Sequence, residues 1–257
     1  MIHDTIPLDF PQFQRPGEPE NFAQKLDVAA GADVVLFPTE AARDEARPHF
    51  EACGGMPPSV IAHLGVPRPD PRPDEVPYDL PRDRPYFVIL GTIEPRKNHA
   101  LLLDIWEKFH ATRPGAEIPY LFILGSRGWN NEEIFERLKN APFMGRTAFE
   151  CPGLSDAAVA ALLEGAAALL QPSYAEGFGL PPVEAAALGT PVVCAPLPVF
   201  KETLGDIPVY ASLSDSYLWE TIIDRLSAPE ATGRAKPDRL SVLPTWDDHF
   251  KKVLAQI

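Results

Sequence analysis

The sequence predicts an α/β protein whose main domain is a doubly wound parallel sheet. After residue 85, apolar stretches of strand length alternate with stretches of helical character, a pattern typical of a parallel sheet covered by helices on both faces. Three of the expected strands are followed by loops rich in glycine or polar residues, at 91–98, 125–129 and 173–179. Ligands of such sheets bind beyond the carboxyl ends of the strands, so these loops mark the expected site.

Residues 1–65 predict part of a second α/β unit. Residues 33–37 form a short apolar strand, Thr39 can cap a helix over 40–52, and residues 59–63 supply another strand. Together these elements make one βαβ unit. Residues 1–17 are rich in proline and have no helical period, so we expect a strand remnant followed by a loop. The segment is too small for a complete domain.

A proline-rich stretch separates this segment from the main domain. Seven prolines occur from Pro67 to Pro85. Proline stiffens the chain toward an extended form and disfavours helices and central strands. We therefore expect an interdomain linker over residues 66–84 and a C-terminal domain over residues 85–257.

The C-terminal domain is expected to alternate regularly. Strands are predicted at 86–90, 120–124, 147–150, 166–171 and 191–194, and helices at 100–111, 131–140, 155–164 and 182–188. Either Ser155 or Asp156 can cap the helix over 155–164.

Composition excludes several classes of function. The formal net charge of −13 argues against broad contact with nucleic acid or anionic lipid, because both need clustered Lys and Arg. The three cysteines lack the paired spacing of metal sites or disulfide frameworks. No apolar run approaches the roughly 20 residues that a membrane helix needs, and the first residues do not resemble a signal peptide. We expect a cytoplasmic protein.

The most informative stretch runs from Ser173 to Glu184. It places two carboxylates, Glu176 and Glu184, around a glycine loop between an apolar strand and an alanine-rich helix. Gly177 and Gly179 are expected to let the backbone take left-handed angles and come close to a ligand. The free N–H groups at the start of the helix, together with its dipole, favour an anion such as a diphosphate. The stretch therefore predicts a site for a phosphorylated sugar.

Several motifs in register resemble family 4 retaining glycosyltransferases, which belong to group 1 and have the GT-B fold. They lie at residues 91–98, 124–129, 172–184 and 189–192. The similarity is greatest to bacterial mannosyltransferase-like enzymes that build lipopolysaccharide and exopolysaccharide. Residues 2–8 resemble a segment late in the family's N-terminal domain, and residues 245–247 resemble its last helix. The resemblance implies one complete Rossmann-like donor-binding domain, preceded by a partial N-terminal segment that lacks most of the acceptor-side domain.

The resemblance also implies catalytic roles. Glu176 would contact hydroxyls of the donor sugar, and Lys97 would hold the diphosphate as the glycosidic bond breaks. Many family members have an arginine where this chain has Thr92, and Arg96 is expected to take over its role. His3 matches a family histidine that approaches the donor sugar from the N-terminal domain.

The donor site implied by the resemblance draws on the three loops and on residues 151–154, which should lie beside the nucleobase. Glu184 would bind the ribose of the nucleotide. Phe178 is as readily a core residue as a wall of the site. The expected donor-binding residues are Gly91, Thr92, Gly125, Arg127, Gly153, Leu154, Gly177, Phe178, Gly179, Leu180 and Glu184.

The implied reaction transfers a sugar, with retention, from a nucleotide-diphosphate donor, with GDP-mannose favoured. The acceptor would be a glycan or a lipid-linked glycan in cell-surface polysaccharide or lipopolysaccharide synthesis. No metal or other cofactor is expected, because cationic side chains can neutralise the diphosphate and no Asp-x-Asp pair occurs in the sequence. We expect the isolated chain to bind the donor weakly and to transfer poorly, since catalysis depends on holding both reactants together.

Two alternatives stay open at this point. In the first, the chain is a hexosyltransferase or the donor-binding part of one. In the second, it is a non-catalytic nucleotide-sugar binding or interaction module that needs another polypeptide for transfer. Peripheral association of the complete enzyme with the inner face of the membrane is also open, as is a homo-oligomer or partner chain covering residues 1–64. A dinucleotide oxidoreductase is disfavoured, since the first strand is not followed by a Gly-x-Gly-x-x-Gly motif with an acid about 20 residues on.

Overall fold

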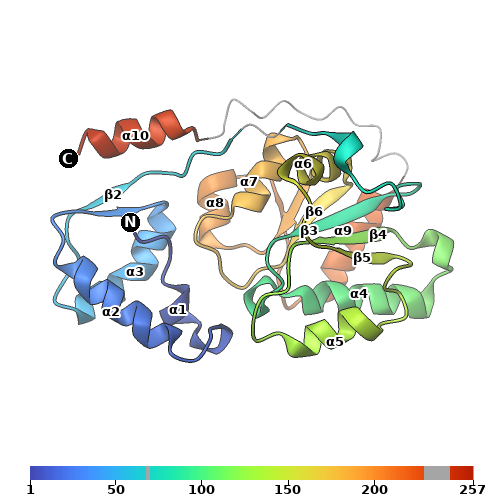
Figure 1. The fold of residues 1–257 in the computed structure, drawn as a ribbon, viewed down its shortest axis with the longest axis horizontal. Helices are drawn as coiled ribbons and strands as arrows, with labels where there is room; N and C mark the ends of the chain where they lie inside the picture. Colours follow the sequence, from blue (N-terminus) through green and yellow to red (C-terminus); the bar gives the residue numbers. More distant parts are fainter. Residues whose placement is uncertain (68–69, 229–243, 257) are drawn as a thin grey trace.

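The computed structural model describes residues 1–67, 70–228 and 244–256, and the predicted linker and C-terminal domain therefore include residues outside the described ones (68, 69, 229–243 and 257). A small N-terminal unit lies beside a larger α/β domain, and the last helix, α10 (Trp246–Leu254), returns along the N-terminal unit (Figure 1). Within the described residues, no helix is both long and apolar enough to cross a membrane.

The N-terminal unit contains the predicted βαβ motif. Strands β1 (Val35–Phe37) and β2 (Ser59–Ile61) are parallel and are connected by α3 (Glu40–Ala52). The Thr39 hydroxyl accepts a hydrogen bond from the Ala42 N–H, so the helix begins where the capping residue predicts. Leu26, Phe37 and Phe50 form the centre of a small separate core. Leu26 belongs to α2 (Glu18–Ala30), a helix that the sequence analysis did not assign.

The expectation of a loop over residues 1–17 was partly wrong. The Ile2 N–H donates to the Leu36 carbonyl at 2.9 Å, which places the first residues along β1 as a strand remnant would lie. After it the chain forms two short helices, α1 (Ile6–Asp9) and the 3₁₀ turn η1 (Pro11–Phe13). Pro7 and Pro11 sit in the first turns of these helices, where the missing N–H has no partner to lose, so the prolines do not prevent helix formation there.

The larger domain is a six-stranded parallel sheet in the order β5-β4-β3-β6-β7-β8. Its strands are β3 (Tyr86–Leu90), β4 (Tyr120–Leu124), β5 (Ala148–Cys151), β6 (Ala168–Gln171), β7 (Val192–Cys194) and β8 (Val209–Tyr210). Its helices are α4 (His99–Thr112), α5 (Glu132–Asn140), α6 (Asp156–Gly165), α7 (Leu180–Ala187), α8 (Pro198–Leu204) and α9 (Ser216–Ser227), with 3₁₀ turns η3 (Pro95–Lys97) and η4 (Gly115–Glu117). The predicted doubly wound sheet is confirmed, and β8, α8 and α9 extend it.

Both faces of the sheet are covered, as the apolar strands predict. On β3, Phe87 and Ile89 belong to one core cluster with Trp106 of α4, while Val88 belongs to the other, which includes Leu162 of α6. Alternate residues of a strand point to opposite faces, so a strand buried on both sides has no polar positions. The Ser155 hydroxyl, one of the two predicted caps, accepts from the Ala158 N–H at the start of α6.

The described part of the predicted linker lies against the larger domain. Its 3₁₀ turn η2 (Pro73–Glu75) packs on α6, and the Arg72 N–H donates to the Ala157 carbonyl at 3.1 Å. Val76 and Leu80 are buried in the core cluster that contains Leu162. This stretch is therefore attached along its length rather than extended in solvent.

Polar contacts join the N-terminal unit to the larger domain. The Glu202 carboxylate of α8 accepts from the Glu40 and Ala41 N–H groups, at 2.8 and 2.9 Å, and so caps α3 from outside its own unit. On α10, the Nδ1–H of His249 donates to the His63 carbonyl at 3.0 Å. Near η1, the Trp129 indole N–H donates to the Phe13 carbonyl at 3.0 Å.

We expect Glu202→Ala to weaken the contact between α8 and the start of α3. The substitution removes the acceptor for two N–H groups at the start of α3, and the loss of a helix cap costs about 1 kcal/mol. Urea unfolding should show a loss of stability of this size, and the Glu40 and Ala41 amides should exchange faster with solvent. Unchanged exchange at both amides would contradict the capping role. Glu133→Ala, at an exposed position of α5, is the matched control.

Candidate active site

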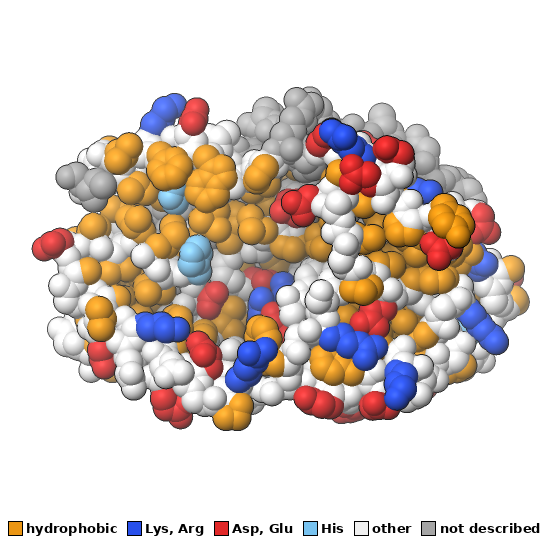
Figure 2. Space-filling view, viewed as in Figure 1, with side chains coloured by type: hydrophobic (Ala, Val, Ile, Leu, Met, Phe, Trp, Pro, Cys, Tyr) orange, Lys and Arg blue, Asp and Glu red, His pale blue; other side chains and the backbone are white. Residues whose placement is uncertain are grey.

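The site lies where the direction of the sheet's strand order reverses. The chain passes outward from β3 through β4 to β5 and then returns to β6, which pairs with β3. The loops that follow β3 and β6 therefore meet beyond the carboxyl ends of adjacent strands, and the Tyr174 N–H donates to the Arg96 carbonyl at 2.8 Å. Figure 2 shows acidic and basic side chains gathered in the recess between the two parts of the molecule. This is the place where doubly wound sheets bind ligands.

Glu176 is the centre of a buried charge network. Its Oε1 accepts hydrogen bonds from Lys97 Nζ at 2.7 Å, Gln171 Nε2 at 2.9 Å and Ser173 Oγ at 2.7 Å. Its Oε2 accepts from an Arg96 guanidinium N–H at 2.7 Å. Glu176 is only 8% exposed and Lys97 only 5%. The predicted catalytic residues Glu176, Lys97 and Arg96 are thus in direct contact.

The network keeps Glu176 ionised. Burial by itself raises the pKa of this carboxyl, but the charges of Lys97 and Arg96 and the hydrogen bonds from Lys97 and Ser173 outweigh burial and lower the pKa to about 2. Burial lowers the pKa of Lys97, and the Glu176 charge opposes that shift without cancelling it. Glu176 therefore favours the charged form of Lys97.

Arg96 connects Glu176 to a second acid. Its Nη2 lies 2.8 Å from the buried Glu94 carboxylate, while Nη1, which contacts Glu176, also donates to the Ala175 carbonyl at 3.0 Å. Burial lowers the pKa of Arg96, but the charges of Glu176 and Glu94 raise it further than burial lowers it. The formal charges of Lys97, Arg96, Glu94 and Glu176 cancel. The network therefore has no excess positive charge before an anion binds.

The two glycines of the loop before α7 have different roles. Gly179 has a φ of +83°, and a Cβ there would collide with the Phe200 ring, so the left-handed prediction is confirmed. The same prediction was wrong for Gly177, because its φ is not positive. Gly177 is required for another reason, because a Cβ would lie 2.7 Å from Asp4 Oδ2 and 2.9 Å from the His3 carbonyl oxygen. The N-terminal segment is thus in close contact with this loop.

Helix α7 begins directly after Gly179, two residues earlier than predicted, with prolines in its first turn. Glu184 lies on this helix, half-buried. Burial and the nearby charge of Asp156 raise its pKa. Within the described part of the chain its carboxylate makes no hydrogen bond or ion pair, in contrast to Glu176. Asp156 begins α6 just after residues 151–154, the stretch expected beside the nucleobase, where exposed Gly153 has a φ of +71°.

Gly91 and Gly125 let the loops after β3 and β4 pack together. Gly91 has a φ of +134°, and a Cβ there would lie 3.3 Å from Lys97 Cε. At Gly125, with a φ of +150°, a Cβ would collide with the Gly91 carbonyl. Arg127 forms a two-pronged pair with Glu150 on the neighbouring β5, with both contacts at 2.8 Å. Its guanidinium is therefore already engaged in this structure.

The other predicted residues lie at the edges of the site. Phe178 is 5% exposed and belongs to the core cluster between α6 and α7, so of its two alternatives the structure favours the core. Thr92 and Leu180 are exposed, Leu154 is half-buried, and the His3 side chain is exposed while its carbonyl lies against the glycine loop.

The structure adds residues that the sequence analysis did not assign to the site. Gln171 and Glu94 belong to the network around Glu176, and Asp4 lies against Gly177. A signal for Gln171 was present, since it is a polar residue at the end of an otherwise apolar strand. His99 is buried, and burial together with the charge of Lys97 lowers its pKa to about 4, so its ring is neutral at pH 7.

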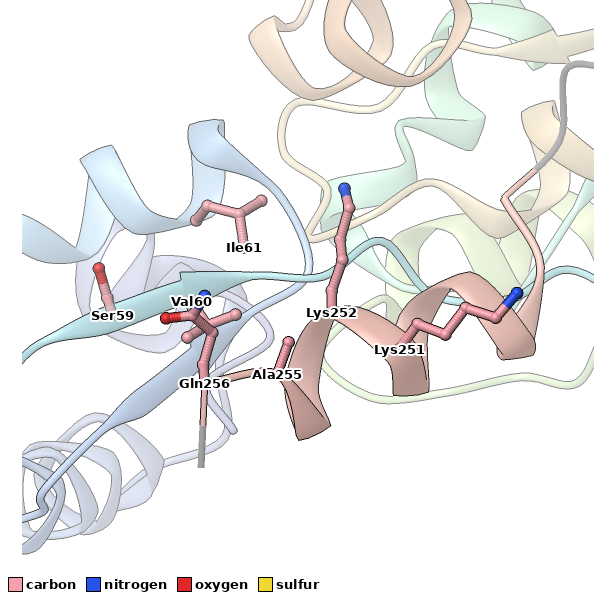
Figure 3. A pocket seen from close by; sticks show the side chains of 7 residues that line it. All are labelled: Ser59, Val60, Ile61, Lys251, Lys252, Ala255 and Gln256. Carbon is pink, nitrogen blue, oxygen red and sulfur yellow. The ribbon is translucent and has the colours of Figure 1, made fainter.

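Outside the Glu176 network, the described residues form an open hollow but no metal site. In the described ranges, no three His, Cys, Asp or Glu side chains are arranged to hold a metal ion. An open hollow of about 540 Å³ lies between β2 and α10, lined by side chains that include Val60 and Lys252 (Figure 3). It contains none of the predicted site residues and lacks the convergent charges of the Glu176 network.

Sequence comparison identifies the class of protein that this fold and site define. The family model for glycosyl transferases group 1 matches residues 73–228, so the chain belongs to that family. It is 30% identical to the serotype-specific mannosyltransferase WbdA of Escherichia coli over 274 aligned residues, which cover all of this chain and 33% of WbdA. It is 41% identical to the O-antigen chain mannosyltransferase RfbU of Salmonella typhimurium over 68 residues, 26% of this chain and 19% of RfbU. The chain thus spans about a third of the length of WbdA.

Solved structures show the same fold. Sucrose-phosphate synthase from Thermosynechococcus elongatus superposes with a TM-score of 0.73 at 19% identity, covering 99% of this chain and 67% of that one. HepE from Anabaena, solved in complex with UDP and glucose, gives a TM-score of 0.68 at 14% identity, covering 100% of this chain and 71% of HepE. The fold is that of a partial GT-B protein, as expected.

Proposed function

We propose that this chain forms the donor side of a retaining, family 4 glycosyltransferase that transfers a hexose from a nucleotide-diphosphate sugar to a glycan. The observation that carries the proposal is the buried network of Lys97, Arg96 and Glu176 beside the glycine loop, at the switch point of the sheet. GDP-mannose is the favoured donor, because WbdA and RfbU, to which the chain is similar, are named mannosyltransferases. These relatives also favour transfer over a role in binding alone.

In the proposed mechanism, Lys97 and Arg96 stabilise the departing diphosphate. Negative charge grows on the leaving group as the glycosidic bond breaks, and fixed cations in a buried site stabilise such charge strongly. The N–H groups of residues 177–179 and the dipole of α7 add to this effect. Glu184, whose carboxylate has no partner among the described residues, would hold the ribose hydroxyls. The departing phosphate takes the proton of the acceptor hydroxyl, so the path needs no protein base. It needs no metal because Lys97 and Arg96 neutralise the diphosphate.

The proposed setting is the synthesis of a cell-surface polysaccharide such as the O-antigen chain named for RfbU. The acceptor would be a growing glycan on a lipid carrier, and the complete enzyme would work in the cytoplasm at the inner face of the membrane. We also propose that no cofactor takes part, because the nucleotide sugar is a substrate and no metal is needed.

Calorimetric titration with GDP, UDP and GDP-mannose tests the proposal. We expect the wild-type chain to bind one nucleotide selectively, and we expect Glu184→Ala to raise its Kd about tenfold or more, since a hydrogen bond to a charged group contributes about 1.5–3 kcal/mol. Glu133→Ala is the control for loss of an exposed acid and should bind as the wild type does. The proposal fails if no nucleotide binds, or if Glu184→Ala leaves the Kd unchanged.

A further inference from the structure

Asp4 reaches the site from the N-terminal unit. Its Oδ1 accepts a hydrogen bond from the Ile6 N–H at 3.1 Å, which fixes the side chain at the start of α1. Its Oδ2 lies so close to the glycine loop that a Cβ on Gly177 would come within 2.7 Å of it. Asp4 also lies within electrostatic reach of Arg96 and Glu176, although it forms an ion pair with neither. A carboxylate from the N-terminal unit thus faces the loop that follows β6.

The two carboxylates beside Gly177 differ in their capacity to accept further hydrogen bonds. Each carboxylate oxygen offers about two lone-pair sites. Oε1 of Glu176 already accepts from Lys97, Gln171 and Ser173, and Oε2 accepts from Arg96. In contrast, no hydrogen bond to Asp4 Oδ2 occurs among the described residues. Glu176 Oε2 keeps about one free lone-pair site and Asp4 Oδ2 keeps about two, so most of the free acceptor capacity at this point belongs to Asp4.

Hydroxyl groups are the natural donors for such an oxygen. The network of Lys97, Arg96, Glu94 and Glu176 has no net formal charge, so Asp4 adds a negative charge at its edge and would disfavour an anion in direct contact with Oδ2. A neutral polyhydroxyl group fits this environment better than a phosphate, because each hydroxyl donates to the carboxylate and gains a charge-assisted hydrogen bond.

We propose that Asp4 binds a hydroxyl group of the hexose being transferred, and that Glu176 instead acts mainly as the counter-ion that holds Lys97 and Arg96 in place. This inference rests on the proposed function, and it makes Asp4 a direct sugar-binding residue at the site. It also gives the close contact at Gly177 a functional reason, because any side chain there would displace Asp4.

The test compares nucleotides with nucleotide sugars in the Asp4→Asn variant. Asparagine keeps a side-chain oxygen for the Ile6 N–H and nearly the same volume against Gly177, but it replaces the charged acceptor by a neutral amide. By calorimetry, we expect the Kd for GDP-mannose to rise about tenfold while the Kd for GDP stays the same. UDP-glucose and UDP form the second probe pair. Asp9→Asn removes an acid from the same segment, where Asp9 bonds Thr5 and His49, and should change neither Kd.

The Kd values distinguish failure of the inference about Asp4 from failure of the proposed function. The inference is overturned if Asp4→Asn and wild type bind both nucleotide sugars with the same Kd. It is also overturned if the Kd rises equally for the nucleotide sugars and for the bare nucleotides, since Asp4 would then belong to the diphosphate clamp or be needed for folding. If Asp4→Asn does not fold, Asp4→Ser provides the same comparison, because its hydroxyl can still accept from the Ile6 N–H. A wild-type chain that binds no nucleotide at all contradicts the proposed function itself, and the inference with it.

Discussion

Glu176→Gln is expected to lower the free energy of unfolding at pH 7 by about 3 kcal/mol or more, because it leaves Lys97 and Arg96 without their shared buried counter-ion. Breaking a buried ion pair by removing one partner costs about 3–5 kcal/mol, since the remaining charge is neither solvated nor paired. Lys97 can relieve part of this cost by losing its proton, because burial already lowers its pKa. Urea unfolding of wild type, Glu176→Gln and the exposed control Glu133→Gln measures the difference.

The pH dependence of this difference identifies its origin. The pKa of Glu176 falls from 4.5 in the unfolded chain to about 2 in the folded protein, so the stability that it contributes is present above about pH 4.5 and is lost as the pH falls toward 2. The gap between wild type and Glu176→Gln should therefore narrow over that range. A gap that stays constant down to pH 3 would mean that shape, and not charge, explains the effect.

Lys97→Ala is expected to cause the largest loss of function. A buried ammonium that meets the diphosphate contributes about 1.5–3 kcal/mol, which corresponds to a rise in the Kd for GDP or UDP of about 10- to 100-fold. In an assembled transferase the rate of transfer should fall by about 10²–10³, since stabilisation of the leaving group is lost where charge develops. Calorimetry measures the first effect, and a radiolabelled transfer assay measures the second.

The fold should tolerate this substitution. Glu176 retains Arg96, Ser173 and Gln171 as partners after Lys97 is removed, so no carboxylate is left unpaired. Lys139→Ala, at an exposed position of α5, controls for the loss of one positive charge. If Lys97→Ala folds like the wild type and binds nucleotide with the same Kd, the diphosphate clamp is located elsewhere.

Most of the fold could be predicted because it depends on local patterns. The boundaries of β3, β4 and α3 match the prediction, since apolar runs end at glycine or proline and Thr39 supplies a cap. The short helices near residue 10 were missed because proline was read as a sign of loop, although it is well tolerated in a first helical turn.

The site was predictable in its location but not in its internal contacts. The topology alone brings the loops after β3 and β6 together, which is why Lys97 and Glu176 lie at the same place, although their direct contact was not predicted. The roles of Gly177 and Asp4 depend on how the N-terminal unit packs against the larger domain, and no local pattern encodes a contact between residues so far apart in the chain. The sequence also did not indicate that Arg127 pairs with Glu150, because the order of the neighbouring strands β4 and β5 had not been predicted.

The most direct test of the central claim is a crystal structure of this chain with GDP. We predict that the diphosphate lies within hydrogen-bond distance of Lys97 Nζ and of the N–H groups of residues 177–179, with the ribose hydroxyls at Glu184. A nucleotide ordered elsewhere, for example in the hollow beside Val60 and Lys252, with no contact to Lys97, would contradict the account.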